Sequence, residues 1–173
     1  MKTDKIIVID LESTCWENQS EGTPEIIEIG IAEIDTFPVS CESILARPEK
    51  SHISEYCTQL TGWTWKELKK TAMPLESAFN KLVKDHGTRS RFTLAFGDDC
   101  DVISKICQEK GYKNPLNKTL NISDLILLKY GRKFSLEQSL RFFGLNYIGK
   151  PHLGKDDAYN AACLAERLLF TIW

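Results

Sequence analysis

The sequence predicts an α/β fold: a single domain over residues 1–173, with a mixed five-stranded sheet flanked by helices. The first supporting observation is the order of the elements, which runs three strands, a helical block, a strand, a helix, a strand and then further helices. The second is the chain length, because 173 residues can form one well-buried core whereas two half-length domains would each be marginal. The third is the lack of any internal repeat, low-complexity tract or linker.

Five short segments carry the apolar, β-branched residues that are typical of strands. The unbroken apolar run from Ile6 to Ile9 favours a buried central strand. The second segment has isoleucines at both parities, so we expect that strand to be covered on both faces. The predicted strands are Lys5–Leu11, Glu25–Asp35, Ser43–Arg47, Phe92–Phe96 and Thr119–Ile122.

From Ser54 onward the apolar residues recur at helical spacing. Leu75, Ala78, Phe79 and Leu82 share one face, and Gly87 is a natural stop for that helix. The predicted helices are Ser54–Leu60, Thr64–Lys70, Leu75–His86, Asp101–Lys110, Asp124–Tyr130, Leu136–Phe143 and Asp157–Phe170.

Composition limits the function only loosely. The formal net charge is −2, from 22 basic and 24 acidic residues, which does not by itself suggest a nucleic-acid partner. If two divalent cations occupied four carboxylates, the charge would become −2 + 4 = +2, which suits a phosphate substrate. The apolar run near the start is too short for a signal peptide or a membrane span, so we expect a cytoplasmic location, no membrane partner and six reduced cysteines.

The first chemical signal is the pair Asp10 and Glu12 at the end of the first strand. Side chains two residues apart in a strand project from the same face, so both carboxylates point together. Like charges beside an apolar strand repel and lose solvation, and a cation between them would relieve both effects. The alternative is a pair of exposed acids at a strand end, with no ligand.

The second signal lies near the other end of the chain. Asp157 is predicted in the first turn of the last helix, where its charge suits the helix dipole. His152 precedes it in a loop bracketed by Gly149 and Gly154, which would let the ring swing toward a reacting water. The alternative is a helix cap beside a surface histidine.

The third signal is the segment Gly97-Asp98-Asp99-Cys100-Asp101, which leaves a strand and opens a helix. Asp98 as N-cap with Asp101 three residues later resembles a capping box, which would explain both without a metal. Taken together, the three signals bring carboxylates from distant segments toward one place. Such a cluster suits two metal ions, and its hard oxygen ligands favour Mg²⁺ or Mn²⁺ over zinc.

The ordered set D-x-E, then D, then H-x(4)-D resembles the DEDDh exonucleases, which share the RNase H-like fold. Within that family the sequence is most similar to the exoribonucleases of the ERI type, which trim RNA 3' ends. The similar segments run nearly from end to end and comprise Asp10–Cys15, Glu25–Gly30, Arg47–Glu49, Ile53–Cys57, Leu60–Gly62, Gly149–His152 and Asp157–Ala158.

The resemblance implies a metal-dependent 3'→5' exonuclease that releases 5'-mononucleotides from single-stranded RNA, with DNA as a further substrate. It implies that Asp10, Glu12, Asp101 and Asp157 hold two Mg²⁺ or Mn²⁺ ions. His152 would act as the general base toward the attacking water, and Glu12 is counted with it as catalytic. The residues expected to line the pocket for the terminal nucleotide are Leu11, Ser13, Thr14, Trp16, Leu60, Thr61, Phe96 and His152.

One position departs from the family pattern. The middle aspartate of the family commonly lies three residues after the strand-ending glycine, and Cys100 occupies that position here. We predict Asp101 as the middle ligand, because it directly precedes the apolar residues that begin the helix, with Asp98 as the alternative.

Two other functions remain open on the sequence. One is a phosphodiesterase acting on short oligonucleotides, because the chain has no appended basic domain to hold a long substrate. The other is a catalytically weak module that binds nucleic-acid 3' ends without cutting them. The resemblance favours RNA over DNA as the partner, and no pattern in the sequence indicates a protein partner.

Overall fold

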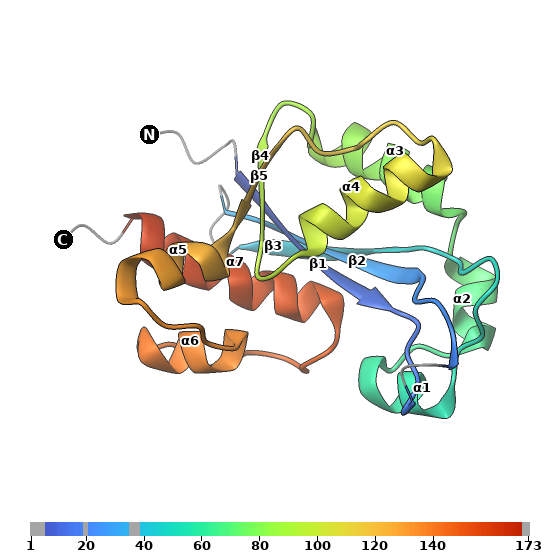
Figure 1. The fold of residues 1–173 in the computed structure, drawn as a ribbon, viewed down its shortest axis with the longest axis horizontal. Helices are drawn as coiled ribbons and strands as arrows, with labels where there is room; N and C mark the ends of the chain where they lie inside the picture. Colours follow the sequence, from blue (N-terminus) through green and yellow to red (C-terminus); the bar gives the residue numbers. More distant parts are fainter. Residues whose placement is uncertain (1–5, 19–20, 35–38, 171–173) are drawn as a thin grey trace.

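The computed structural model describes residues 6–18, 21–34 and 39–170, and these residues form one twisted sheet with helices packed around it (Figure 1). The strands are β1 (Ile6–Ser13), β2 (Ile26–Glu33), β3 (Ser40–Leu45), β4 (Phe92–Ala95) and β5 (Lys118–Asn121). Their order in the five-stranded sheet is β3-β2-β1-β4-β5. β2 pairs antiparallel with β1 and β3, whereas β4 pairs parallel with β1 and β5, so the predicted mixed sheet is confirmed.

Helices cover both faces of this sheet (Figure 1). One face packs against α3 (Leu75–His86) and α4 (Asp99–Lys110), and the other against α5 (Ile122–Tyr130), α6 (Leu136–Phe142) and α7 (Gly154–Phe170). The short helices α1 (Glu55–Thr61) and α2 (Trp65–Thr71) build a third, smaller cluster against Ile27 of β2. The expected α/β fold with flanking helices is therefore present.

The alternation of β1 decides which way its acidic residues point. Ile7 and Ile9 enter the core under α3 and α4, while Ile6 and Val8 enter the core under α7. Successive side chains of a strand point to opposite faces, so the even-numbered Asp10 and Glu12 continue the face covered by α7. The strand extends to Ser13, two residues beyond the predicted end, and carries both carboxylates within it.

Several element ends differ from the predicted ones for local reasons. α7 begins at Gly154 and α4 at Asp99, so both helices start earlier than the predicted Asp157 and Asp101. β3 begins at Ser40 rather than Ser43, because as an edge strand it tolerates exposed polar residues that carry no apolar signal. The predicted ends Lys5 and Asp35 lie outside the described residues.

Among the helices that the structure describes, none combines the length and the apolar character needed to cross a membrane. The six cysteines, all within the described ranges, are free thiols.

Candidate active site

Asp10 and Glu12 lie close together at the carboxyl end of β1. Glu12 is only 8% exposed. Burial, followed by the charges of Asp99 and Asp157, raises the pKa of Asp10 well above its ordinary value. Burial together with Asp157 and Glu28 raises the pKa of Glu12 to about 8, while Lys150 opposes that rise. The end of β1 is therefore a place where negative charge is concentrated and poorly solvated.

A close contact between two glycines brings the start of α7 to these acids. Gly30 lies opposite Asp10 in the β1–β2 register, on the face that α7 covers. A Cβ atom added to Gly30 would overlap the carbonyl of Gly154, the first residue of α7. Because no side chain separates the strand from the helix here, the first turns of α7 reach the level of Asp10.

Asp157 is held in this position by two hydrogen bonds. The hydroxyl of Tyr147 donates to its Oδ1 at 2.8 Å, and the backbone N–H of His152 donates to its Oδ2 at 2.8 Å. Burial raises the pKa of Asp157, and these two donors only partly offset the rise. The carboxylate that the sequence predicted at the start of the last helix therefore faces Asp10 and Glu12.

His152 completes the group. One ligand atom each from Glu12, His152 and Asp157 lies within 4.8 Å of the others. The backbone of His152 adopts φ 62°, and it is the one non-glycine residue with positive φ in the described part of the chain. The predicted D-x-E pair and H-x(4)-D pair thus meet in space, although they come from opposite ends of the sequence.

Among the three acids at the start of α4, Asp99 is the one whose charge acts on Asp10 and Glu12. Asp99 raises the pKa of both Asp10 and Glu12, and burial raises its own pKa to about 7 although the backbone N–H of Leu11 donates to it. Asp98 and Asp101 are exposed. The predicted capping box is also absent, because the side chain of Asp98 makes no cap hydrogen bond at the start of α4.

The helical spacing of residues in α4 separates Asp99 from Asp101. Asp99 lies one turn before Ile103, which is fully buried, so it belongs to the side of α4 that faces the sheet. Asp101 lies one turn before Lys105, which is exposed. The prediction of Asp101 rested on a helix that begins at the apolar residues, whereas α4 begins two residues earlier, at Asp99.

The residues expected to contact the terminal nucleotide divide into two groups. Leu11, Ser13, Leu60 and Phe96 are half-buried, and His152 is exposed. Thr14 and Thr61 are buried, and each hydroxyl already has a backbone partner: that of Thr14 accepts from the Glu25 N–H, and that of Thr61 donates to the Cys57 carbonyl.

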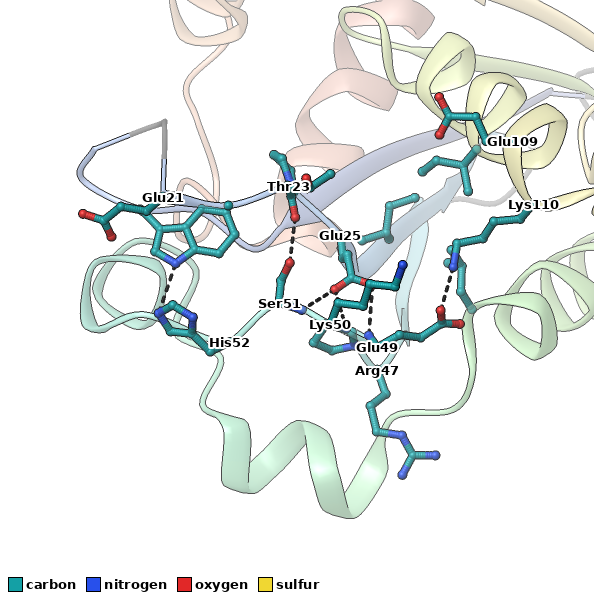
Figure 2. A pocket seen from close by; sticks show the side chains of 17 residues that line it. Glu21, Thr23, Glu25, Arg47, Glu49, Lys50, Ser51, His52, Glu109 and Lys110 are labelled. Carbon is teal, nitrogen blue, oxygen red and sulfur yellow. Dashed lines mark hydrogen bonds and ion pairs between the residues drawn. The ribbon is translucent and has the colours of Figure 1, made fainter.

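Trp16, which the sequence placed in this pocket, is also buried. Its ring lies against Gly22, and its indole N–H donates to His52 at 3.2 Å. Trp16 and His52 line a separate cavity of about 540 Å³ (Figure 2). The carboxylates of the site are not among the residues that line that cavity. In the same cavity, the Glu25 side chain binds the backbone of Lys50 and Ser51 (Figure 2).

Glu28 lies opposite Glu12 in the β1–β2 register and is fully buried. It accepts hydrogen bonds from the Ser43 hydroxyl, from the Trp63 indole N–H at 2.5 Å and from the backbone N–H of Lys155 at 3.3 Å. One buried carboxylate thus joins β2 to β3, to the segment before α2 and to the start of α7.

Comparison with known proteins agrees with this geometry. A family model described as Exonuclease (RNase_T) matches residues 7–165, nearly the whole of the chain. The chain belongs to this exonuclease family. The match covers every residue of the carboxylate group and His152.

Two curated relatives support the resemblance to the ERI type. The chain is 30% identical over 188 residues to 3'-5' exoribonuclease 1 of Homo sapiens, covering 96% of this chain and 52% of that protein. It is 30% identical over 194 residues to ERI1 exoribonuclease 2 of Xenopus laevis, covering 95% of this chain and 28% of that protein. The chain thus spans about half, or less, of the length of these relatives.

Solved structures point to the same family. The nuclease domain of 3'hExo, a DEDDh family member bound to rAMP, superposes with a TM-score of 0.82 at 28% identity, covering 96% of this chain and 92% of that one. A 3'-exonuclease solved for its 3'-end-specific recognition of the histone mRNA stem-loop gives a TM-score of 0.81 at 27% identity, covering 96% and 81%. The expected DEDDh family and RNase H-like fold are confirmed.

Proposed function

We propose that this protein is a metal-dependent 3'→5' exonuclease that releases 5'-mononucleotides from single-stranded RNA. One observation carries the proposal: carboxylates from β1, α4 and α7 gather beside His152. Burial raises the pKa of each of these carboxylates, and the charge of Asp157 raises the pKa of Asp10, Glu12 and Asp99 further. Placing buried like charges together costs free energy, and bound cations would recover it. Residues 1–173 act in this proposal as a single exonuclease domain.

The donor set fits divalent metal ions with a preference for oxygen ligands. Asp10, Glu12, Asp99 and Asp157 would hold two Mg²⁺ or Mn²⁺ ions, with Asp99 in the role that the sequence gave to Asp101. Lys150 lowers the pKa of Glu12, but one ammonium group offsets at most one of four charges. Bound cations would supply an activated water and stabilise the leaving oxygen at phosphorus.

The protein's own groups would orient the reaction. His152 lies beside Glu12 and Asp157, and its exposed ring would take the proton from the attacking water as general base. Leu11, Ser13, Leu60 and Phe96 would border the terminal nucleotide.

RNA is the proposed substrate because of the relatives. The curated relatives are named exoribonucleases, and the solved neighbours are described with rAMP and with a histone mRNA stem-loop. Discrimination against DNA would require contacts to the 2'-hydroxyl of the substrate.

The test is digestion of 5'-labelled single-stranded RNA and DNA of matched sequence, with Mg²⁺ or with Mn²⁺. We expect a ladder that shortens from the 3' end, faster on RNA, and that disappears with EDTA and in the Asp10→Ala variant. Substrates of two to twenty nucleotides, compared in the same assay, separate a polymer exonuclease from a phosphodiesterase for short oligonucleotides. Intact RNA and DNA with either metal, despite measurable binding, would contradict the proposal and favour a 3'-end binding module.

A further inference from the structure

The loop that carries His152 is fastened to α7 at alternate residues. Side chains of α7 bind the backbone of Ile148, Lys150 and His152 in turn. The three side chains involved are Asn160, Asp156 and Asp157, and only Asp157 belongs to the proposed metal site. The sequence predicted a loop bracketed by glycines that would let the His152 ring swing toward a reacting water. In the structure the backbone of this loop is held to α7 at three residues.

Asn160 both accepts a hydrogen bond from the backbone of Ile148 and donates one to it. Its Oδ1 accepts from the N–H of Ile148 at 2.9 Å, and its Nδ2 donates to the carbonyl of Ile148 at 2.7 Å. The same Nδ2 donates to the Asp156 carbonyl at 2.7 Å, which ties the contact to the backbone of α7. Asn160 is only 1% exposed, so its buried side-chain amide would be costly to leave without these partners.

A second anchor depends on Gly149. The backbone N–H of Lys150 donates to Asp156 Oδ2 at 2.8 Å. A Cβ atom at Gly149 would overlap that carboxylate, and Gly149 has φ 93°, a conformation that other residues adopt only with strain. The loop therefore reaches α7 only because this position lacks a side chain.

The position of the His152 ring follows from this backbone. The residue is exposed, so tight packing does not orient its ring, and its φ of 62° lies in a region that non-glycine residues rarely adopt. A general base must lie within hydrogen-bonding distance of the water that it deprotonates, and a displacement of about 1 Å can lower a rate about 100-fold.

We propose that Asn160 is a positioning residue for catalysis, which holds the His152 loop in the conformation that the reaction needs. The proposal rests on the exonuclease function proposed above. The hydrogen bonds of Asn160 go to the backbone of Ile148 and Asp156 and not to the carboxylates of the proposed metal site, so it would act on kcat through the loop and leave KM nearly unchanged.

The test compares Asn160→Ala with Asn114→Ala. Asn114 also fixes a loop through its side chain, donating to Ser104 Oγ at 3.0 Å and accepting from Leu116 N–H at 2.9 Å, but it lies outside the site. We expect Asn160→Ala to lower kcat between about 10-fold and 100-fold with KM within about twofold, and Asn114→Ala to leave both within about twofold. Amide hydrogen exchange should accelerate at Ile148 and Lys150 in Asn160→Ala alone.

Gly149→Ala provides a second variant that leaves the core side of α7 intact, because Gly149 is exposed. It should also lower kcat and accelerate exchange at Lys150. Equal kcat in wild type, Asn160→Ala and Gly149→Ala would overturn the positioning role, as would a fall in Asn160→Ala no larger than in Asn114→Ala. An inactive wild type would instead overturn the exonuclease function itself, and the positioning role with it.

Discussion

Asp99 and Asp101 lie two residues apart on α4 and meet different surroundings. Burial and neighbouring carboxylates raise the pKa of Asp99, whereas Asp101 is exposed to solvent. Motif spacing identified the acidic segment, but a spacing rule cannot choose among three acids when the helix start is displaced by two residues. Asp10, Glu12, His152 and Asp157 were easier to select, because each belongs to a pair with fixed separation.

The first prediction follows from that difference. Asp99→Asn should abolish exonuclease activity, with a loss of at least about 1000-fold, because it removes a charge from the proposed metal ligands. Asp101→Asn, two residues away, should retain activity within about threefold. Initial rates on labelled RNA at saturating Mn²⁺ measure both, and the reverse result would restore Asp101 as the middle ligand.

A second prediction concerns pH and the metal-free protein. The pKa of Glu12 is raised from 4.5 to about 8 in the folded state, mainly by burial, so the folded protein binds this proton more tightly than the unfolded chain does. The resulting stability is fully present below about pH 4.5 and is lost as the pH rises to about 8.

In EDTA, the free energy of unfolding should therefore decline across this range, and Glu12→Gln should reduce the decline. The variant should exceed the wild type in stability at pH 8 by about 1–3 kcal/mol, because it removes a poorly solvated charge. Urea unfolding at several pH values measures this, and parallel curves for the two proteins would show that Glu12 titrates normally.

At the scale of the elements, the spacing of apolar residues predicted the strands and helices well. The errors are in the ends of elements whose limits depend on packing against other parts of the chain. Leu75–His86 has the same ends in prediction and structure, because its apolar face and its terminal Gly87 are both visible in the sequence. The predicted start of α7 lies three residues too late: the helix begins at Gly154, whose backbone packs against Gly30 of β2. Long-range contacts of this kind leave no periodic signal.

The third prediction tests that contact. Gly30→Ala should destabilise the protein by about 3 kcal/mol or more, because its Cβ meets backbone that cannot move aside. Gly111→Ala is the control: nothing lies within 4 Å of its Cβ, and only its φ of 69° opposes the substitution, at about 1 kcal/mol. Chemical denaturation of both variants decides the matter, and equal losses would mean that α7 shifts easily on the sheet.

A fourth prediction concerns Glu28. In Glu28→Gln the side-chain amide must turn its NH₂ toward either the Trp63 indole N–H or the backbone N–H of Lys155, so one buried donor loses its acceptor. We expect a loss of about 1–3 kcal/mol.

Trp63→Phe removes the competing indole donor and should make Glu28→Gln less costly in the double variant than alone. A double-mutant cycle on unfolding free energies measures this coupling. Strict additivity would argue that the indole hydrogen bond is unimportant.

At the scale of the whole molecule, the position of the charged residues matters more than the net charge. The net charge is only −2, yet four of the acidic groups converge on one end of β1. Composition could not reveal this cluster of carboxylates, because it forms only when β1, near the start of the sequence, packs against α7, near its end. The total charge is accordingly a poor guide to what this protein binds.

The fifth prediction is that metal ions stabilise the fold. Mn²⁺ at about 100 times its Kd should increase the free energy of unfolding by about 2.7 kcal/mol, through binding to the folded state. In Asp99→Asn the increase should fall to a small fraction of this, while Asp101→Asn should respond like the wild type. Calorimetric melting with and without EDTA measures the effect independently of catalysis.

The joining of β1 to α7 has a consequence for how the protein is made. Asp10 and Glu12 leave the ribosome early, whereas His152 and Asp157 follow after most of the chain has been synthesised. A nascent polypeptide that has not yet reached α7 carries only part of the carboxylate group, because Asp157 comes from that helix. The carboxylate group is therefore complete only after α7 has been synthesised and has packed against β1.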